Sequence, residues 1–219
     1  MFRKILPMLL CFVLFCGGSA LAEQDLEGRG ADEWLAASER QIHLERYANA
    51  ISCATNAIII NPKLDRAFFL RGVSYTHLGV YHQAIREFAE AIRLNPSNGQ
   101  YYAWRAEALV ESRIYDEAIA DLDKAVSMNP NLAVVYQKRG YVYLLTEKHA
   151  EAIADFDRAL SLNAKDYWSY YQRAGSCYAL GRKQEALNNY RSFLECAPDY
   201  LKQSYRDFAQ ARIKELEGN

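Results

Sequence analysis

The strongest constraint on this chain is a short punctuation motif that returns every 34 residues. Asn-Pro occurs at 61–62, 95–96 and 129–130, and the series continues as Asn163-Ala164 and Ala197-Pro198. Self-similarity at a period of about 20 to 50 residues is typical of a solenoid or array, in which each unit packs only against its neighbours. The sequence therefore divides into five units, 31–64, 65–98, 99–132, 133–166 and 167–200.

Fixed positions within the units predict two packed helices in each. Unit positions 4, 8 and 11 share one helical face, and positions 17, 20, 21, 24, 27 and 28 share a face of a second helix. Position 8 is always a small residue. Position 4 is always aromatic, as Trp34, Phe68, Tyr102, Tyr136 and Tyr170. Position 20 is always alanine, as Ala50, Ala84, Ala118, Ala152 and Ala186. Small residues let the two helices approach closely. The proline at position 32 should end each second helix, because it disfavours helix for the residue before it.

This pattern resembles the tetratricopeptide repeat, a 34-residue helix-turn-helix unit with aromatic, small and proline residues at the same offsets. The resemblance covers residues 31–200. It implies an all-α fold, a right-handed superhelical solenoid of five helix-turn-helix repeats. An apolar stripe continues beyond residue 200 and predicts a C-terminal capping helix in 201–219. Units 1 and 5 depart from the pattern at Ala54 and Phe193, as terminal units do.

The N-terminus has the features of a secretory signal peptide. Arg3 and Lys4 precede an apolar run from Ile5 to Phe15, and an A-x-A processing site ends at Ala22. We expect a signal peptide at 1–22, a linker at 23–30 and an exported protein, periplasmic if bacterial and otherwise secreted. The apolar run is shorter than the about 20 residues that span a bilayer, so no stable membrane insertion is expected after cleavage. A retained N-terminal anchor is the alternative.

Composition and motifs argue against several classes of function. The chain is 51% hydrophobic and 24% charged with a formal net charge of -1, which suits a folded protein and gives no general attraction to nucleic acid. No nucleophile elbow, phosphate loop or H-E-x-x-H pair occurs. His43 and His77 share unit position 13, but no third ligand accompanies them. We expect no nucleic-acid partner, no metal, no cofactor and no catalysis.

The candidate site is a groove that the resemblance implies. In tetratricopeptide arrays the first helices line a concave groove, and unit positions 2, 5, 9 and 12 point into it. The candidates at these positions are Phe69, Thr76, Glu107, Gln137, Tyr141, Trp168, Tyr171 and Tyr178. The Lys at position 5 and Asn at position 9 of members that bind chaperone tails are absent here, so a carboxylate clamp is not supported.

Aromatic residues in the C-terminal half of this groove favour binding of a peptide segment from a partner protein, because aromatic side chains supply contact area at low entropy cost. Glu39 and Glu107 would add an acidic fringe, which suits a partner segment with apolar side chains and a basic end. The alternative for Tyr171 and Tyr178 is that they pack against the capping helix, because a terminal unit must cover its open face.

A second row of residues raises a different possibility. Unit position 7 is arginine in four units, position 23 is acidic in three of these units, and position 25 adds two aspartates: Arg71, Arg105, Arg139 and Arg173, then Glu87, Asp121 and Asp155, then Asp123 and Asp157. We expect arginine–carboxylate pairs that join the units rather than an anion-binding ladder. The alternative function is an accessory subunit of an envelope assembly, secretion or protease or hydrolase complex that binds through its convex charged face.

Overall fold

The computed structural model describes residues 30–218, and over this range it contains eleven α-helices and no strand. The expected signal peptide at 1–22 and all but the last residue of the expected linker at 23–30 lie outside the described residues. The helices form five consecutive pairs and a final single helix: α2 (Ala31–His43) with α3 (Tyr47–Ile60), α4 (Asp65–His77) with α5 (Tyr81–Leu94), α6 (Gly99–Glu111) with α7 (Tyr115–Met128), α8 (Ala133–Leu145) with α9 (His149–Leu162), α10 (Tyr167–Ala179) with α11 (Lys183–Cys196), and α12 (Gln203–Glu217). The expected all-α solenoid is confirmed.

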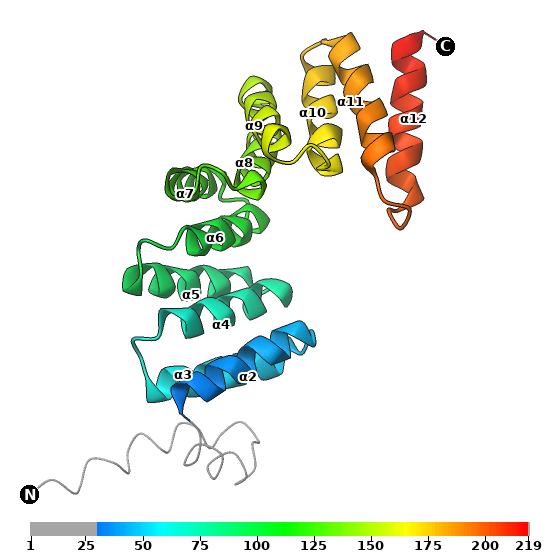
Figure 1. Ribbon diagram of the computed structural model, residues 1–219. Coiled ribbons are helices and arrows are strands. Elements are labelled where there is room, and N and C mark those ends of the chain that lie inside the picture. Colours follow the sequence, from blue (N-terminus) through cyan, green and yellow to red (C-terminus); the bar gives the residue numbers. More distant parts are fainter. Residues whose placement is uncertain (1–29, 219) are drawn as a thin grey trace, which may run out of the picture.

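Each pair coincides with one 34-residue unit of the sequence. Every first helix has 13 residues and begins at the first residue of its unit, and every second helix has 14. The pairs stack side by side into an arc, with α2 and α12 at its two ends (Figure 1). Within residues 30–218 no helix is both long and apolar enough to cross a membrane.

The turn inside each pair requires one residue in the left-handed region. This residue stands at unit position 15 in all five units: Glu45 (φ 56°), Gly79 (φ 72°), Arg113 (φ 61°), Glu147 (φ 59°) and Gly181 (φ 72°). In the second unit the Val80 N–H donates to the Tyr75 carbonyl at 2.9 Å and the Gly79 N–H to the Thr76 carbonyl at 3.0 Å. These are the two bonds of a Schellman motif, which satisfies carbonyls at the helix end.

The second helices end at unit position 30, and asparagine side chains as well as proline help to end them. Side-chain oxygens of Asn61, Asn129 and Asn163 accept the N–H of the residue two positions on, at 3.1, 3.3 and 3.2 Å. This Asx turn competes with the helix for the backbone. Helix α9 ends at Leu162 although Ala164 replaces the proline in this unit. Proline is therefore not required to end the second helix, contrary to the sequence-based expectation.

Close packing within each pair follows from the small residues at positions 8 and 20. All five alanines at position 20 have no exposed surface. In the second and fourth units position 8 is glycine, and the ring of Phe88 or Phe156 occupies the space that its Cβ would need. Phe88 and Phe156 are themselves fully buried. The size of the residue at position 8 thus limits the size of the side chain at position 24, as at any well-packed interior site.

Helix α12 covers the last pair. It packs on α11, with Ala209 fully buried and Tyr205, Ile213 and Leu216 against the same cluster as Phe193. Charged residues of both signs stand between its apolar ones. Helix α12 therefore has one apolar side, which covers the open face of the fifth unit.

Candidate functional site: a pocket between α8, α10 and α12

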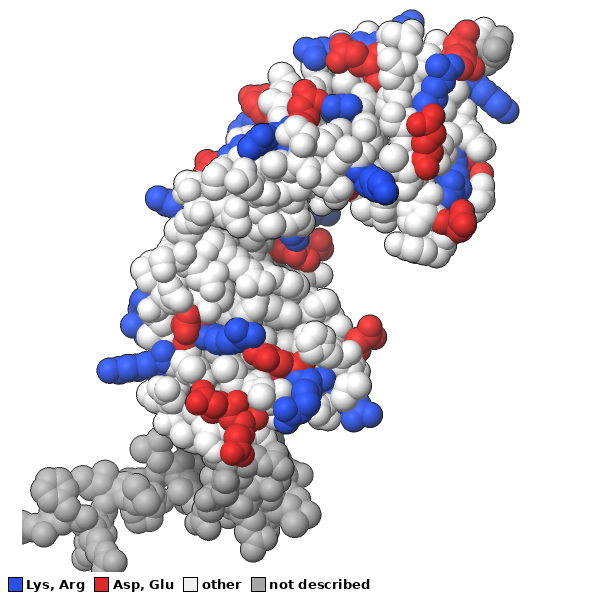
Figure 2. All heavy atoms as spheres, in the orientation of Figure 1, with Lys and Arg blue, Asp and Glu red and all other residues white. Residues whose placement is uncertain are grey.

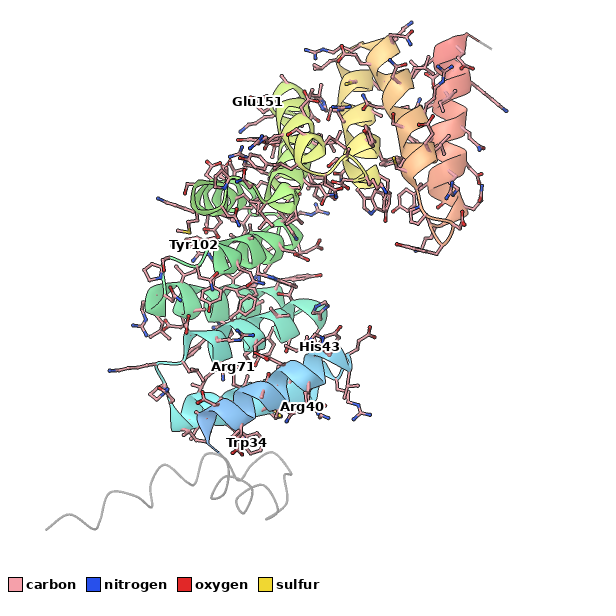
Figure 3. All side chains as sticks on the ribbon, in the orientation of Figure 1. Trp34, Arg40, His43, Arg71, Tyr102 and Glu151 are labelled. Carbon is pink, nitrogen blue, oxygen red and sulfur yellow. The ribbon has the colours of Figure 1, made fainter. Side chains whose placement is uncertain are left out.

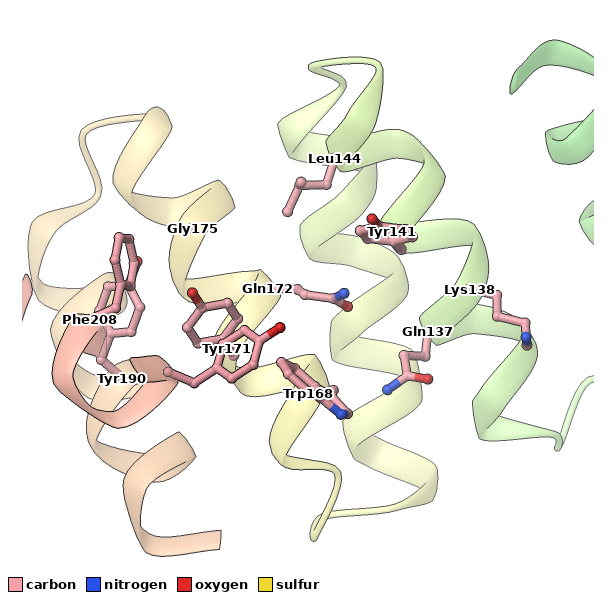
Figure 4. Close-up of a pocket in the computed structure, with 11 residues that line it drawn as sticks. Gln137, Lys138, Tyr141, Leu144, Trp168, Tyr171, Gln172, Gly175, Tyr190 and Phe208 are labelled. Carbon is pink, nitrogen blue, oxygen red and sulfur yellow. The ribbon is translucent and has the colours of Figure 1, made fainter. Parts of the chain in front are cut away.

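A pocket of about 590 Å³ opens where α8 faces α10 and α12 (Figure 4). Four helices line it: Gln137, Lys138, Tyr141 and Leu144 from α8, Trp168, Tyr171, Gln172 and Gly175 from α10, Tyr190 from α11, and Tyr205 and Phe208 from α12. Most of these side chains are aromatic or aliphatic, and a few are polar. That combination, at a volume between about 300 and 1,000 Å³, is typical of a ligand site.

One side of the pocket is an aromatic wall, made of Trp168, Tyr171, Tyr205 and Phe208. The rings of Trp168 and Tyr205 have centroids 4.9 Å apart and meet at 86°, and those of Tyr171 and Tyr205 are 5.7 Å apart at 89°. Phe208 lies 6.0 Å from Tyr171. Edge-to-face pairs add about 0.5–1.5 kcal/mol each beyond burial. The wall is therefore held in place before a ligand arrives, which lowers the ordering cost of binding.

The opposite side is α8, where fixed partners orient the polar side chains. The Gln137 amide donates to both carboxylate oxygens of Asp166, at 2.9 and 3.0 Å. The Lys138 ammonium pairs with Glu107 of α6. Tyr141, one turn further along α8, has 38% of its surface exposed. The α8 side thus offers an exposed phenol ring flanked by amide and charged groups that are already engaged.

The phenols of Tyr141, Tyr171 and Tyr190 are uncharged at neutral pH. Burial raises the pKa of Tyr141 and of Tyr171 above the usual value, and it raises the pKa of Tyr190 to about 12. The Glu111 carboxylate contributes further to the Tyr141 shift, since a nearby negative charge opposes a second one. These rings consequently present apolar faces and neutral hydroxyl groups to whatever enters.

Gln172 and Gly175 distinguish α10 from a purely apolar surface. The Gln172 side chain reaches from α10 toward α8 (Figure 4), and its Oε1 is buried without a hydrogen-bond donor. An unsatisfied buried acceptor costs about 1–3 kcal/mol. Gly175 has nothing within 4 Å of the position that a Cβ would take. The pocket therefore has an acceptor in need of a donor, and one position at which a side chain would enter open space.

The structure brings four of the eight sequence-predicted residues together in this pocket: Gln137, Tyr141, Trp168 and Tyr171. Glu107 lies beside it through its pair with Lys138. Tyr178 instead meets α12, where its hydroxyl donates to Glu215 and accepts from Arg212. Tyr171 also contacts α12, so the alternative that these two tyrosines pack on the capping helix is confirmed, although Tyr171 keeps a face on the pocket.

The remaining two predicted residues lie in the N-terminal half, away from the pocket. Phe69 is only 9% exposed, because Tyr101, at a ring distance of 5.0 Å, and Trp104, at 6.2 Å, cover it. It belongs to the core rather than to an open groove. The Thr76 hydroxyl donates to the Gly72 carbonyl at 3.0 Å, within its own helix. Neither residue contributes to an aromatic surface that a partner could reach.

Sequence reasoning missed Tyr205 and Phe208, and with them the α12 side of the pocket. The signal was available for Tyr205. Counting the 34-residue period onward from residue 200 places Tyr205 at unit position 5, the position of Tyr171 and Gln137. Helix α12 thus repeats the register of a first helix. The apolar stripe beyond residue 200 predicts only a cap and gives no reason to place its side chains in a site.

The arginine row forms the expected pairs and largely neutralises the acidic row. Arg105 binds Asp121 with two hydrogen bonds of 2.7 and 2.6 Å, and Arg139 binds Asp155 with two of 2.8 and 2.7 Å. Arg139 also reaches Asp123 of the preceding unit at 2.7 Å.

The pairs at the two ends of the row follow the same plan. Arg71 meets Glu87 at 2.8 Å and donates to Thr55 of the first unit at 3.1 Å; it lies within the stack in Figure 3. Arg173 pairs with Asp157 and donates to Asn189. Consecutive units are joined by the contacts Arg71–Thr55, Arg139–Asp123 and Arg173–Asp157. The pairs Arg105–Asp121 and Arg139–Asp155 instead join the two helices of one unit, so the expectation that the pairs join the units is confirmed only in part. Asp121 and Asp155 are buried in their pairs rather than displayed on the convex face.

The two histidines at unit position 13 are exposed, and His77 makes ring contacts. The His77 ring stacks on Tyr47 at a centroid distance of 4.5 Å and an angle of 8°. Within the described range 30–218, no three or more His, Cys, Asp or Glu side chains are grouped to hold a metal ion. Cys177 is fully buried, and burial raises the pKa of its thiol, as expected for a residue that replaces a core tyrosine.

Comparison with known families addresses the repeat directly. Two family models, both described as tetratricopeptide repeat, match residues 69–133 and 133–166. Residues 69–166 thus match the tetratricopeptide repeat in sequence. The pattern in the sequence indicated this family, and the match covers the second, third and fourth units. No curated protein matches the chain in sequence.

Solved structures with the same fold are numerous. YrrB, described as a tetratricopeptide-repeat protein with an unusual peptide-binding site, is 17% identical with a TM-score of 0.70, over 88% of this chain and 98% of its own. PilF of Pseudomonas aeruginosa is 18% identical with a TM-score of 0.71, over 86% and 92%. MamA of Desulfovibrio magneticus RS-1 is 16% identical with a TM-score of 0.72, over 80% and 99%. At these identities the similarity shows the fold alone.

Proposed function

We propose that this chain is an exported, non-catalytic interaction module that holds a peptide segment of a partner protein in the pocket between α8, α10 and α12. The observation that carries the proposal is the aromatic wall, whose rings are fixed by one another and face an open pocket. Buried aromatic anchors supply most of the energy in protein interfaces. The peptide-binding site described for YrrB, which has a similar fold, supports the same use here.

Export rests on the sequence at the N-terminus. The basic start at Arg3, the apolar run after it and the processing site at Ala22 together match a cleaved signal peptide. N-terminal sequencing of the soluble protein should therefore begin at Glu23. A soluble protein that begins at Met1 would contradict export by this route.

Capture from the exported protein fraction tests the pocket. Gly175→Leu places a side chain in the open space beside the aromatic wall, because nothing lies within 4 Å of its Cβ position. Ala179→Leu adds the same side chain at an exposed position of the same helix, outside the pocket, and is the matched control. We expect mass spectrometry to identify proteins that the wild type and the Ala179→Leu variant retain and the Gly175→Leu variant loses. Equal retention by all three proteins would contradict the proposed function.

A further inference from the structure

The polar groups around the pocket indicate which kind of peptide segment it accepts; this inference rests on the proposed function. We propose that the segment places a bulky apolar side chain against the aromatic wall and carries a neighbouring Lys or Arg that pairs with Glu111. The partner is thus a basic, apolar segment rather than an acidic one or a free C-terminal carboxylate.

The first argument is the direction of the hydrogen-bonding groups. Gln172 Oε1 is buried at the pocket without a donor. The Gln137 amide turns its NH₂ group to Asp166, so its oxygen is the end that remains for another group. The Gln137 oxygen is therefore the acceptor left for a bound segment, and the buried Gln172 oxygen accepts as well once its side chain turns toward the pocket. A peptide N–H or a Lys or Arg side chain satisfies such acceptors, whereas a carboxylate cannot, because an ionised carboxylate only accepts.

The second argument is the charge that remains after the ion pairs are counted. Glu39 is paired with Arg66 at 2.7 Å, and Glu107 with Lys138, so neither supplies a free negative charge. Glu111 is exposed and has no cation of the described chain within ion-pair distance. It also lies in the last turn of α6, where the helix dipole disfavours a negative charge.

Glu111 is close enough to the pocket to act on its contents. Glu111 stands one helical turn after Glu107 on α6, and the pocket residue Tyr141 stands one turn after Lys138 on α8, so the Glu107–Lys138 pair places Glu111 beside Tyr141. Its charge also raises the pKa of Tyr141. Figure 2 shows acidic atoms beside basic ones in the hollow of the arc, below the C-terminal limb. Lys138 is the one lysine or arginine that lines the pocket within residues 30–218, and it is held by Glu107. A cation beside the apolar anchor is therefore attracted, and an anion is repelled.

A random peptide library displayed on phage, selected on the purified protein and counter-selected on the Gly175→Leu variant, tests the inference. We expect enriched peptides with an aromatic, leucine or methionine residue and a Lys or Arg within a few positions. The Kd of an enriched peptide, measured by fluorescence anisotropy, should rise about two- to five-fold with Glu111→Gln, the range for one partly exposed ion pair. Glu195→Gln, an exposed carboxylate of α11 outside the pocket, should leave the Kd unchanged.

The two proposals fail in different ways. Peptides that depend on Gly175 but have acidic or uncharged flanks would overturn the basic-segment inference and leave the peptide-binding function standing. An unchanged Kd with Glu111→Gln would do the same. If no peptide distinguishes the wild type from the Gly175→Leu variant, the proposed function fails, and the inference fails with it.

Discussion

Replacing Gly72 by alanine should destabilise the array, although alanine favours a helix more than glycine does. A Cβ on Gly72 would lie 2.7, 2.9 and 3.0 Å from three atoms of the Phe88 ring. Phe88 is fully buried, so the ring cannot withdraw without moving its neighbours. Overpacking of this kind costs about 1–3 kcal/mol, and the gain in helix propensity returns about 1 kcal/mol. We expect the free energy of unfolding to fall by up to about 2 kcal/mol.

Urea unfolding followed by helical circular dichroism measures this change. Gly175→Ala is the matched control, because its Cβ meets nothing within 4 Å, and this variant should gain up to about 1 kcal/mol. The double variant Gly72→Ala with Phe88→Leu reproduces the natural pair Ala106 and Leu122 of the third unit. It should lose less stability than the sum of its two single changes. The same gain for Gly72→Ala as for Gly175→Ala, or strict additivity in the double variant, would refute the reasoning.

Three further predictions concern stability. In a double-mutant cycle, Arg139→Ala with Asp155→Ala should show a coupling energy above about 1 kcal/mol, and Arg139→Ala with Asp123→Ala should show about 0.2–1 kcal/mol. The reason is that the Asp155 side chain is 8% exposed, whereas that of Asp123 is 54% exposed. Equal coupling energies would contradict this. Glu147→Gly should raise Tm, because Glu147 has a φ of 59° where two other units have glycine; an unchanged or lower Tm would speak against relief of strain. Burial raises the pKa of Tyr190 to about 12 from 10.0, so its stabilising contribution is complete below pH 10 and is lost as the pH rises toward 12. Tyr190→Phe should flatten the fall in stability over this range in chemical unfolding, and an identical fall would count against it.

The fold could be predicted because its determinants repeat. Five alanines at unit position 20 and a small residue at position 8 leave one way to pack two helices, and the structure has that packing. The end of the second helix was attributed to proline alone, and the unit with Asn163 and Ala164 shows that asparagine also ends it. A pattern that is nearly invariant does not reveal which of its members is necessary.

The site could be predicted only in part. The unit position of a residue predicts the side of the helix on which its side chain lies, but not the size of the side chains that surround it. Phe69 and Tyr171 both stand at position 5, yet Trp104 of the next unit covers Phe69, while Tyr171 keeps a face on the pocket. Tyr205 and Phe208 were overlooked because α12 has no punctuation of its own in the sequence. Half of the aromatic wall thus comes from a helix that was predicted only as a cover.

The most direct measurement of the central claim is an anisotropy titration of a labelled, library-selected peptide against three proteins. The account predicts that Gly175→Leu raises the Kd at least about tenfold, since it removes the space beside the aromatic wall, a loss of roughly 1.4 kcal/mol or more. The Ala179→Leu protein, with the same side chain on the same helix outside the pocket, should bind as the wild type does. Equal Kd values for the wild type and the Gly175→Leu protein would show that the pocket between α8, α10 and α12 is not where the peptide binds.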